Sequence, residues 1–123
     1  MLAGADPTAF LAATDRERAR EFFAGALGLP LVDESSFALV FDLNGIPLRV
    51  TFVTELKPAD YTVLGWHVAD VEAAADELAA RGVSTERFAG MEQDERGIWD
   101  SPGGARIAWF RDPDGNVLSI TQS

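Results

Sequence analysis

The sequence predicts an α+β fold made of two tandem copies of one βαβββ unit. This prediction rests on a hairpin pattern that occurs twice in the sequence. Asp112-Pro113-Asp114-Gly115-Asn116 lies between two short apolar runs, and seventy residues earlier Asp42-Leu43-Asn44-Gly45 lies between two more. Proline and glycine at these places are typical of turns, and the aromatic and β-branched residues of the runs are typical of strands. Each stretch therefore predicts a hairpin.

A second repeated pattern precedes each hairpin, because an apolar alternation stops at Asp15 and, fifty-five residues later, at Asp70. An aspartate side chain can accept hydrogen bonds from the free amides of a helix start. Gly28 and Gly82 fit helix C-termini. The apolar residues between these signals recur with helical spacing: Ala19, Phe22, Phe23, Ala26 and Leu27 in the first copy, and Val71, Ala74, Ala75, Leu78 and Ala79 in the second.

The elements follow in the same order in both copies. The first copy is predicted to contain a strand at 8–14, a helix at 15–27, a strand at 29–33 and a hairpin at 37–53. The second is predicted to contain a strand at 61–68, a helix at 70–81, a weak strand at 83–88, an acidic loop at 89–97, a short strand at 98–100 and a hairpin at 105–121. Residues 54–60, with Pro58 and both charge signs, look like a linker. We expect one domain over 1–123, with modules at about 8–53 and 61–123.

The amino-acid composition limits the kinds of molecule that this protein is expected to bind. The net charge is −10, from 20 acidic and 10 basic residues, and there is no cysteine. Such a surface disfavours nucleic acid and anionic membranes and attracts cations, although solubility alone also explains it. Disulfides and thiolate metal sites are excluded. No apolar stretch reaches the roughly 20 residues of a membrane span, and no signal peptide is visible, so we expect a soluble, cytoplasmic protein.

In each copy, a curved mixed sheet with its helix outside would leave a concave face that encloses a cleft. Strand alternation assigns residues to the two faces. The residues predicted to lie under the helices are Leu11, Ala13, Leu48, Val50, Trp66, Val68, Leu118 and Ile120. The concave set is Thr8, Phe10, Ala12, Phe37, Leu39, Phe41, Arg49, Thr51, Val63, Gly65, His67, Ile107, Trp109, Ser119 and Thr121. This set is largely apolar and aromatic, as in a small-molecule pocket.

The two βαβββ copies, the aspartates before the helices, Leu27-Gly28-Leu29 and the final Asp-Pro-Asp-Gly-Asn hairpin together resemble the vicinal oxygen chelate superfamily. That superfamily contains glyoxalase I, extradiol dioxygenases, fosfomycin-modifying enzymes and bleomycin resistance proteins. The resemblance covers essentially the whole chain. It implies the glyoxalase/bleomycin resistance fold and, in the metal-using members, ligands at four places: early in the first strand of each module and on the last strand of each hairpin.

By this resemblance, the four metal-ligand positions are Thr8, Arg49, Val63 and Ser119. The metal-using members hold His, Gln or Glu there, whereas none of these four residues is such a ligand. A divalent ion needs several imidazole or carboxylate ligands that converge on one point. We therefore expect no metal and no other cofactor, and we expect metal-dependent lyase, isomerase or dioxygenase chemistry to be absent.

Arg49 and His67 are the polar residues of most interest on the concave face. An arginine on an apolar face needs a partner, which could be a carboxylate such as Asp42 or Glu55, or an anionic or carbonyl group of a ligand. His67 is the only histidine. It could be a hydrogen-bond donor or general base, and is a weak catalytic candidate, or its ring could simply be satisfied by backbone or water.

The aromatic side chains and the acidic loop also have two interpretations. Phe10, Phe37, Phe41 and Trp109 could be core or could face a ligand. The loop Met91-Glu92-Gln93-Asp94-Glu95-Arg96 lacks the spacing of a calcium loop, which favours a solvated flap over a metal site. Trp99, just after it, could anchor a lid. The predicted ligand-binding set is Phe10, Phe37, Leu39, Arg49, Thr51, His67, Trp99, Trp109 and Ser119.

Three functions compete. The first is a bleomycin-resistance-like homodimer that binds a small aromatic or cationic molecule without catalysis. The second is a metal-dependent glyoxalase-like lyase, isomerase or dioxygenase with a non-standard site, or an enzyme that depends on His67 alone. The third is a regulatory or interaction module whose cleft is vestigial. The missing ligands, the aromatic face and the acidity favour the first, so a small molecule and a second copy of the chain are the expected partners.

Overall fold

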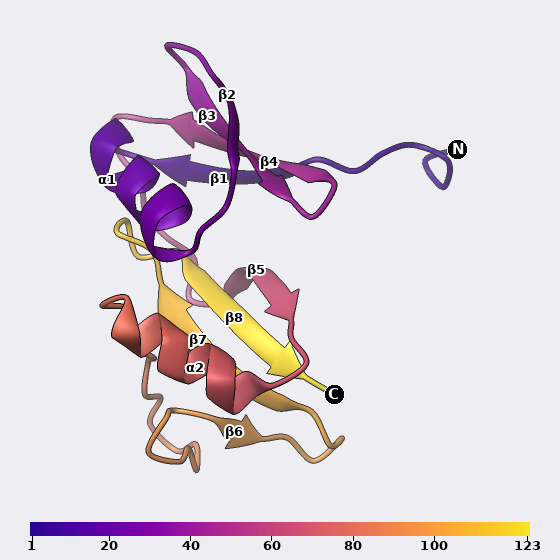
Figure 1. Cartoon of the computed structure of the whole chain (residues 1–123), viewed down its shortest axis with the longest axis vertical. Helices are drawn as coiled ribbons and strands as arrows, with labels where there is room; N and C mark the ends of the chain where they lie inside the picture. The colour runs from indigo at the N-terminus through magenta and orange to yellow at the C-terminus, as the bar shows by residue number, and fades with distance from the viewer. The chain divides into compact units, whose positions relative to one another are not determined.

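The computed structural model describes all residues from Met1 to Ser123 and divides them into two compact units, Met1–Lys57 (unit 1) and Pro58–Ser123 (unit 2). Each unit has one four-stranded mixed sheet and one helical segment (Figure 1). This confirms the predicted α+β fold with two βαβββ modules. In each unit, the open face is the surface of the sheet that the helix does not cover.

In unit 1, the sheet has the order β1-β4-β3-β2. Strand β1 runs parallel to β4, and the other neighbours are antiparallel. The elements are β1 (Ala9–Ala13), α1 (Arg16–Arg20), a π-helix η1 (Glu21–Ala26), β2 (Leu31–Glu34), β3 (Ala38–Leu43) and β4 (Ile46–Phe52). The parallel pair follows from the crossover through the helix, which returns the chain to the same sheet.

In unit 2, the sheet has the matching order β5-β8-β7-β6, again with its first pair parallel. The elements are β5 (Thr62–His67), α2 (Val71–Ala80), β6 (Trp99–Asp100), β7 (Arg106–Arg111) and β8 (Val117–Gln122). Helix α2 packs on β7 and β8 (Figure 1). No helix of the chain combines the length and apolar character that crossing a membrane would require.

Both helices begin where the sequence predicts. Asp15 and Asp70 are extended N-cap residues, and each carboxylate accepts a hydrogen bond at 3.0 Å from the amide three residues later. The first helix then widens, because Leu27 N–H donates to Phe22 C=O across five residues, and it ends at Gly28, whose φ is 70°. Glycine tolerates this left-handed conformation. The predicted single helix at 15–27 is thus an α-helical turn followed by a π-helix.

Each unit has a core between its helix and its sheet. In unit 1, the Phe23 ring from η1 lies 5.6 Å from the Phe41 ring of β3, centroid to centroid. In unit 2, the Trp66 and Phe110 rings stack at 6.2 Å. Leu48, Val50 and Leu118 are fully buried on the same sides of their sheets. The residues predicted to lie under the helices on β4 and β8 are therefore in the core.

The predicted strand at 83–88 does not form. This stretch is irregular, and one backbone hydrogen bond, from Glu86 N–H to Trp109 C=O at 2.7 Å, joins it to β7. Strand β6 instead pairs with β7 through Trp99 and Asp100. A stretch with one bond to its neighbour lacks the repeated ladder that defines a strand.

The predicted orientation of β3 is also wrong by one residue. Leu39 pairs with Val50 and Phe41 with Leu48, so both lie in the core rather than on the open face, where Val40 lies beside Arg49. Phe37, just before β3, shares the phase of Leu39 and is 72% exposed. A shift of one residue turns every side chain of a strand over.

Unequal hairpin loops explain this error. Leu43 pairs with Ile46, which leaves the two-residue loop Asn44-Gly45, with φ of 53° and 100°. In the second hairpin Asp112 N–H donates to Asn116 C=O, which leaves the three-residue loop 113–115. Both lengths are common in hairpins. Aligning Asp42 with Asp112 therefore misplaces the strand before the loop, and Val40 is the true counterpart of Trp109.

Candidate binding surfaces

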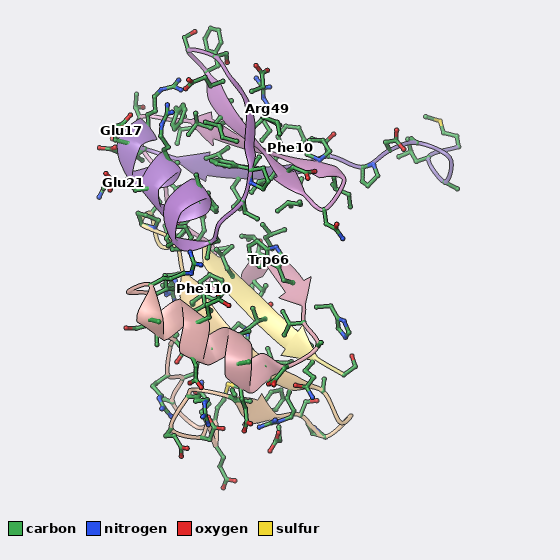
Figure 2. All side chains as sticks on the ribbon, in the orientation of Figure 1. Phe10, Glu17, Glu21, Arg49, Trp66 and Phe110 are labelled. Atoms are coloured by element: carbon green, nitrogen blue, oxygen red, sulfur yellow. The ribbon has the colours of Figure 1, made fainter.

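The open face of unit 1 has a row of side chains across all four strands. Phe10 of β1 pairs with Arg49 of β4, Arg49 with Val40 of β3, and Val40 with Asp33 of β2. Figure 2 labels Phe10 and Arg49 on their neighbouring strands. The next row contains Ala12, Thr51 and Ala38. As the sequence predicts, Phe10, Arg49 and Thr51 share this face.

Arg49 differs from the other arginines of unit 1. Arg16 and Arg20 form ion pairs with Glu34, and Arg18 forms one with Asp15. Arg49 is half-buried and has no ion pair or hydrogen bond within its unit. Asp42, one of its two predicted partners, instead accepts from the Gly45 amide at 2.8 Å. Neither Asp42 nor Glu55 pairs with it, so no carboxylate of unit 1 neutralises this guanidinium.

The open face of unit 2 is more aromatic. One row joins Gly65, Ser119 and Trp109, and a second joins His67, Thr121, Ile107 and Trp99. The Trp109 ring lies 5.4 Å from the Phe88 ring in an edge-to-face arrangement and 6.1 Å from the Trp99 ring. We call Phe88, Trp99 and Trp109 the aromatic cluster. Its members are partly exposed, so ring surface is available to a ligand.

The loop beneath the aromatic cluster is held by Gln93. Its side-chain amide donates to the carbonyls of Glu86 and Gly97 at 2.8 Å, and its carbonyl accepts from the Phe88 amide at 2.8 Å. Asp94 accepts from the amides of Arg96 and Ile98 at 2.9 Å. The stretch predicted as a solvated flap is therefore held in place by hydrogen bonds of its own Gln93 and Asp94 side chains. Trp99, which was predicted to anchor a lid, lies in strand β6. The cluster is preorganised by these bonds.

Ser119 was predicted to bind a ligand, but it is buried beside Gly65 on this face. Ser119 is only 7% exposed, so its hydroxyl offers little surface to a ligand. A Cβ atom at Gly65 would lie 2.5 Å from the Ser119 Oγ. Real atoms do not approach so closely, so the backbone of β5 passes next to Ser119 because residue 65 has no side chain.

His67 lies at the end of β5 and is exposed. Its Nε2 is 3.0 Å from the Ser123 hydroxyl, and no carboxylate holds the other ring nitrogen. A general base needs a positioned substrate proton, and catalytic histidines are usually oriented by a third group. The geometry shows a histidine with a hydroxyl partner at the edge of the open face.

The residues at the four family metal positions do not fit a metal ion. Thr8 and Arg49 come from unit 1, and Val63 and Ser119 from unit 2. A guanidinium repels a cation, a valine has no donor atom, and hydroxyls alone bind transition metals weakly. Within each unit, no three His, Asp or Glu side chains gather where they could hold an ion. We therefore assign no metal chemistry to these residues.

Three contributors to these surfaces were missed by sequence reasoning. Val40 was not among the residues predicted for the open face, where Leu39 and Phe41 were named in its place because of the loop offset. Phe88 and Gln93 were placed in a weak strand and a flap, and no periodic signal marks either. A glutamine that holds a loop through its backbone leaves no local pattern, because the partners of its amide are set by tertiary structure.

Known structures share this fold. A fosfomycin resistance protein, FosX, from Listeria monocytogenes has a TM-score of 0.76 at 15% identity, over 100% of this chain and 95% of that one. A member of the glyoxalase/bleomycin resistance protein/dioxygenase superfamily from Sphaerobacter thermophilus has a TM-score of 0.74 at 23% identity, over 100% of both chains. A lactoylglutathione lyase from Agrobacterium tumefaciens has a TM-score of 0.70 at 20% identity, over 98% of this chain and 94% of that one. At these identities the likeness concerns the fold.

Comparison with curated proteins finds no match. The family model of the glyoxalase/bleomycin resistance protein/dioxygenase superfamily matches residues 5–120, which is nearly the whole chain. The resemblance identified from the repeated motifs is thereby confirmed, and the chain belongs to the glyoxalase/bleomycin resistance protein/dioxygenase superfamily.

Proposed function

We propose that this chain is a binding protein for a small aromatic molecule and works without a metal ion. This proposal rests on the aromatic cluster of unit 2, because Trp99 and Trp109 of the open sheet face are grouped with the ring of Phe88, and the Gln93 hydrogen bonds fix the loop that follows Phe88. Preorganised rings bind a flat ligand with little loss of side-chain entropy. The four family metal positions without suitable donors support the absence of metal chemistry.

A ligand screen by thermal denaturation tests this proposal. A ligand at about 100 times its dissociation constant adds about 2.7 kcal/mol of stability, which is a clear rise in the melting temperature. We expect hits among planar aromatic compounds, and we expect Trp109→Leu to weaken them at least about tenfold. Phe37→Ala is the matched control, because Phe37 is an exposed aromatic residue of unit 1 and lies outside the aromatic cluster.

Two results would contradict the proposal. The first is a broad aromatic panel that never raises the melting temperature. The second is stoichiometric zinc, nickel, iron or manganese in protein purified without chelator, which would favour the metal-dependent enzyme instead. In that case His67→Ala should abolish turnover.

A cationic aromatic ligand is the second candidate, and the net charge of −10 favours it. The faces of tryptophan rings attract cations, by about 0.5–1 kcal/mol at exposed sites. Binding of a quaternary ammonium compound that weakens after Trp109→Leu and persists after Arg49→Gln would identify this mode.

We also propose a homodimer, because each sheet ends in two strands with unpaired edges, β1 and β2 in unit 1 and β5 and β6 in unit 2. Open edges in a soluble protein are usually covered or kept short. Sedimentation equilibrium over a range of concentrations measures the mass of the assembly, and a monomer at all concentrations would exclude the dimer.

A further inference from the structure

We infer that Phe10 and Arg49 of unit 1 form a subsite for an aromatic carboxylate, in which the ring of the ligand packs on Phe10 and its carboxylate binds Arg49. The inference goes beyond the proposed function, because it gives unit 1 a binding site of its own, for aromatic acids, in addition to the aromatic cluster of unit 2. Two observations support it: Arg49 has no ion pair or hydrogen bond within its unit, and the exposed ring of Phe10 lies on the adjacent strand.

The positive charge of Arg49 is not neutralised within unit 1. By strand register, two carboxylates share the open face of unit 1 with Arg49: Asp33, beyond Val40 in the same row, and Asp42, two residues further along β3. Neither forms an ion pair with it. The Asp42 carboxylate instead accepts a hydrogen bond from the Gly45 amide of the hairpin loop. Every other arginine of unit 1 has a carboxylate partner, so this guanidinium keeps its hydrogen-bonding capacity for another molecule.

The geometry of Arg49 and Phe10 suits a carboxylate joined to an apolar ring. A guanidinium presents a planar fork of N–H donors that matches the two oxygens of a carboxylate. Arg49 is half-buried between Phe10 and Val40, where water screens a charge less than at a free surface. Phe10 is 65% exposed, so most of its side chain is uncovered. A cation and an open ring on adjacent strands suit a ligand that has both an oxyanion and an apolar ring.

Unit 2 has different residues at the two equivalent positions. The counterparts of Phe10 and Arg49 are Gly65 and Ser119, which form the same parallel pair on β5 and β8. Gly65 has no side chain, and Ser119 is buried. The pairing geometry of the fold therefore does not itself require a phenylalanine or an arginine at these positions.

The test uses the full-length protein and three probes of one shape: 2-naphthoate, 2-naphthamide and 2-naphthylmethylammonium. Affinities come from calorimetry, and chemical shifts of the backbone amides locate the bound probe. We expect 2-naphthoate to bind about tenfold or more tightly than the amide, and to shift the signals of β1 and β4. Arg49→Gln should abolish this preference, and Arg49→Lys should restore only part of it because lysine lacks the fork.

Arg18→Gln is the matched control, since Arg18 is an exposed arginine of the same unit. Naphthyl phosphonate is added to tell a general oxyanion site from a carboxylate site. Equal binding of all probes, or a naphthoate preference that survives Arg49→Gln, would overturn the inference and leave the proposed function intact. If none of the probes binds at millimolar concentration, the inference falls, and the aromatic panel above decides the proposed function separately. A dimer lost on Arg49→Gln would also overturn it, because Arg49 would then pair with the second copy.

Discussion

The two units have equivalent cores and different open faces. Phe41 and Phe110 are both fully buried and both contact an aromatic ring beneath the helix side of their sheets, Phe23 in unit 1 and Trp66 in unit 2. On the open faces the counterparts diverge, with Phe10 and Arg49 in unit 1 against Gly65 and Ser119 in unit 2. The repeated fold therefore constrains the residues on the helix side of each sheet and leaves those on the open face free to vary.

The hairpin loops diverge in the same way. Asp42 makes one side-chain hydrogen bond, to the Gly45 amide. Asp112 is 6% exposed, and its carboxylate accepts from the amides of Asp114 and Asn116 and from the Asn116 side chain, at 2.8–3.0 Å. Burial is the main cause that raises the pKa of Asp112 above its usual 3.8, and these hydrogen bonds act against it.

Truncating the core rings tests whether the cores are equivalent. Phe41→Ala and Phe110→Ala should each lower the free energy of unfolding by about 3–5 kcal/mol, because each removes a buried ring and leaves a cavity. Urea denaturation of both variants measures the effect, and Phe37→Ala, at an exposed site, should change it by less than about 0.5 kcal/mol. A loss below about 1 kcal/mol in one of the two core variants would break the equivalence.

Removing the loop aspartates tests the difference between the hairpins. Asp112→Ala should cost about 2–3 kcal/mol, because it leaves several buried donors without an acceptor, whereas Asp42→Ala should cost about 1 kcal/mol or less. Thermal and urea unfolding of the two variants give the comparison directly. Equal losses of unfolding free energy would show that the aspartate hydrogen bonds stabilise the second loop no more than the first.

Adding a methyl group to β5 tests the close approach of Ser119. Gly65→Ala should destabilise the protein by about 1–3 kcal/mol, since its Cβ would overlap the Ser119 Oγ. Combining it with Ser119→Ala should recover most of the loss. Gly103→Ala, in open space and without a left-handed backbone, is the control. If the double variant is no more stable than Gly65→Ala alone, the contact does not explain the glycine.

The smallest effect is a dependence on pH. Because the pKa of Asp112 is raised in the folded state, that state binds its proton more tightly than the unfolded chain does. The contribution of this group to stability therefore rises as the pH falls through the range just above 3.8, and is lost as the pH rises. Asp112→Asn removes it, so the stability of wild type minus that of the variant should increase on acidification. A flat or opposite difference would contradict the raised pKa.

The sequence was sufficient for the features that depend on local chemistry. The Asp15 and Asp70 caps were predicted, and so was the order of the strands along the chain apart from the stretch at 83–88, since each has a periodic or capping signal within a few residues. The phase of β3 could not be deduced, because it depends on whether a loop has two or three residues. The Gln93 bonds could not be deduced either, because their partners are backbone groups brought together by the fold.

The unequal hairpin loops show where this chain tolerates changes of length. One residue more or less at the tip leaves the paired strands in phase, as Phe41–Leu48 and Phe110–Leu118 demonstrate. The same insertion within β3 or β7 would turn over every side chain that follows it. The tips are thus natural positions for indels during divergence of a duplicated gene, and suitable sites for inserting an epitope tag.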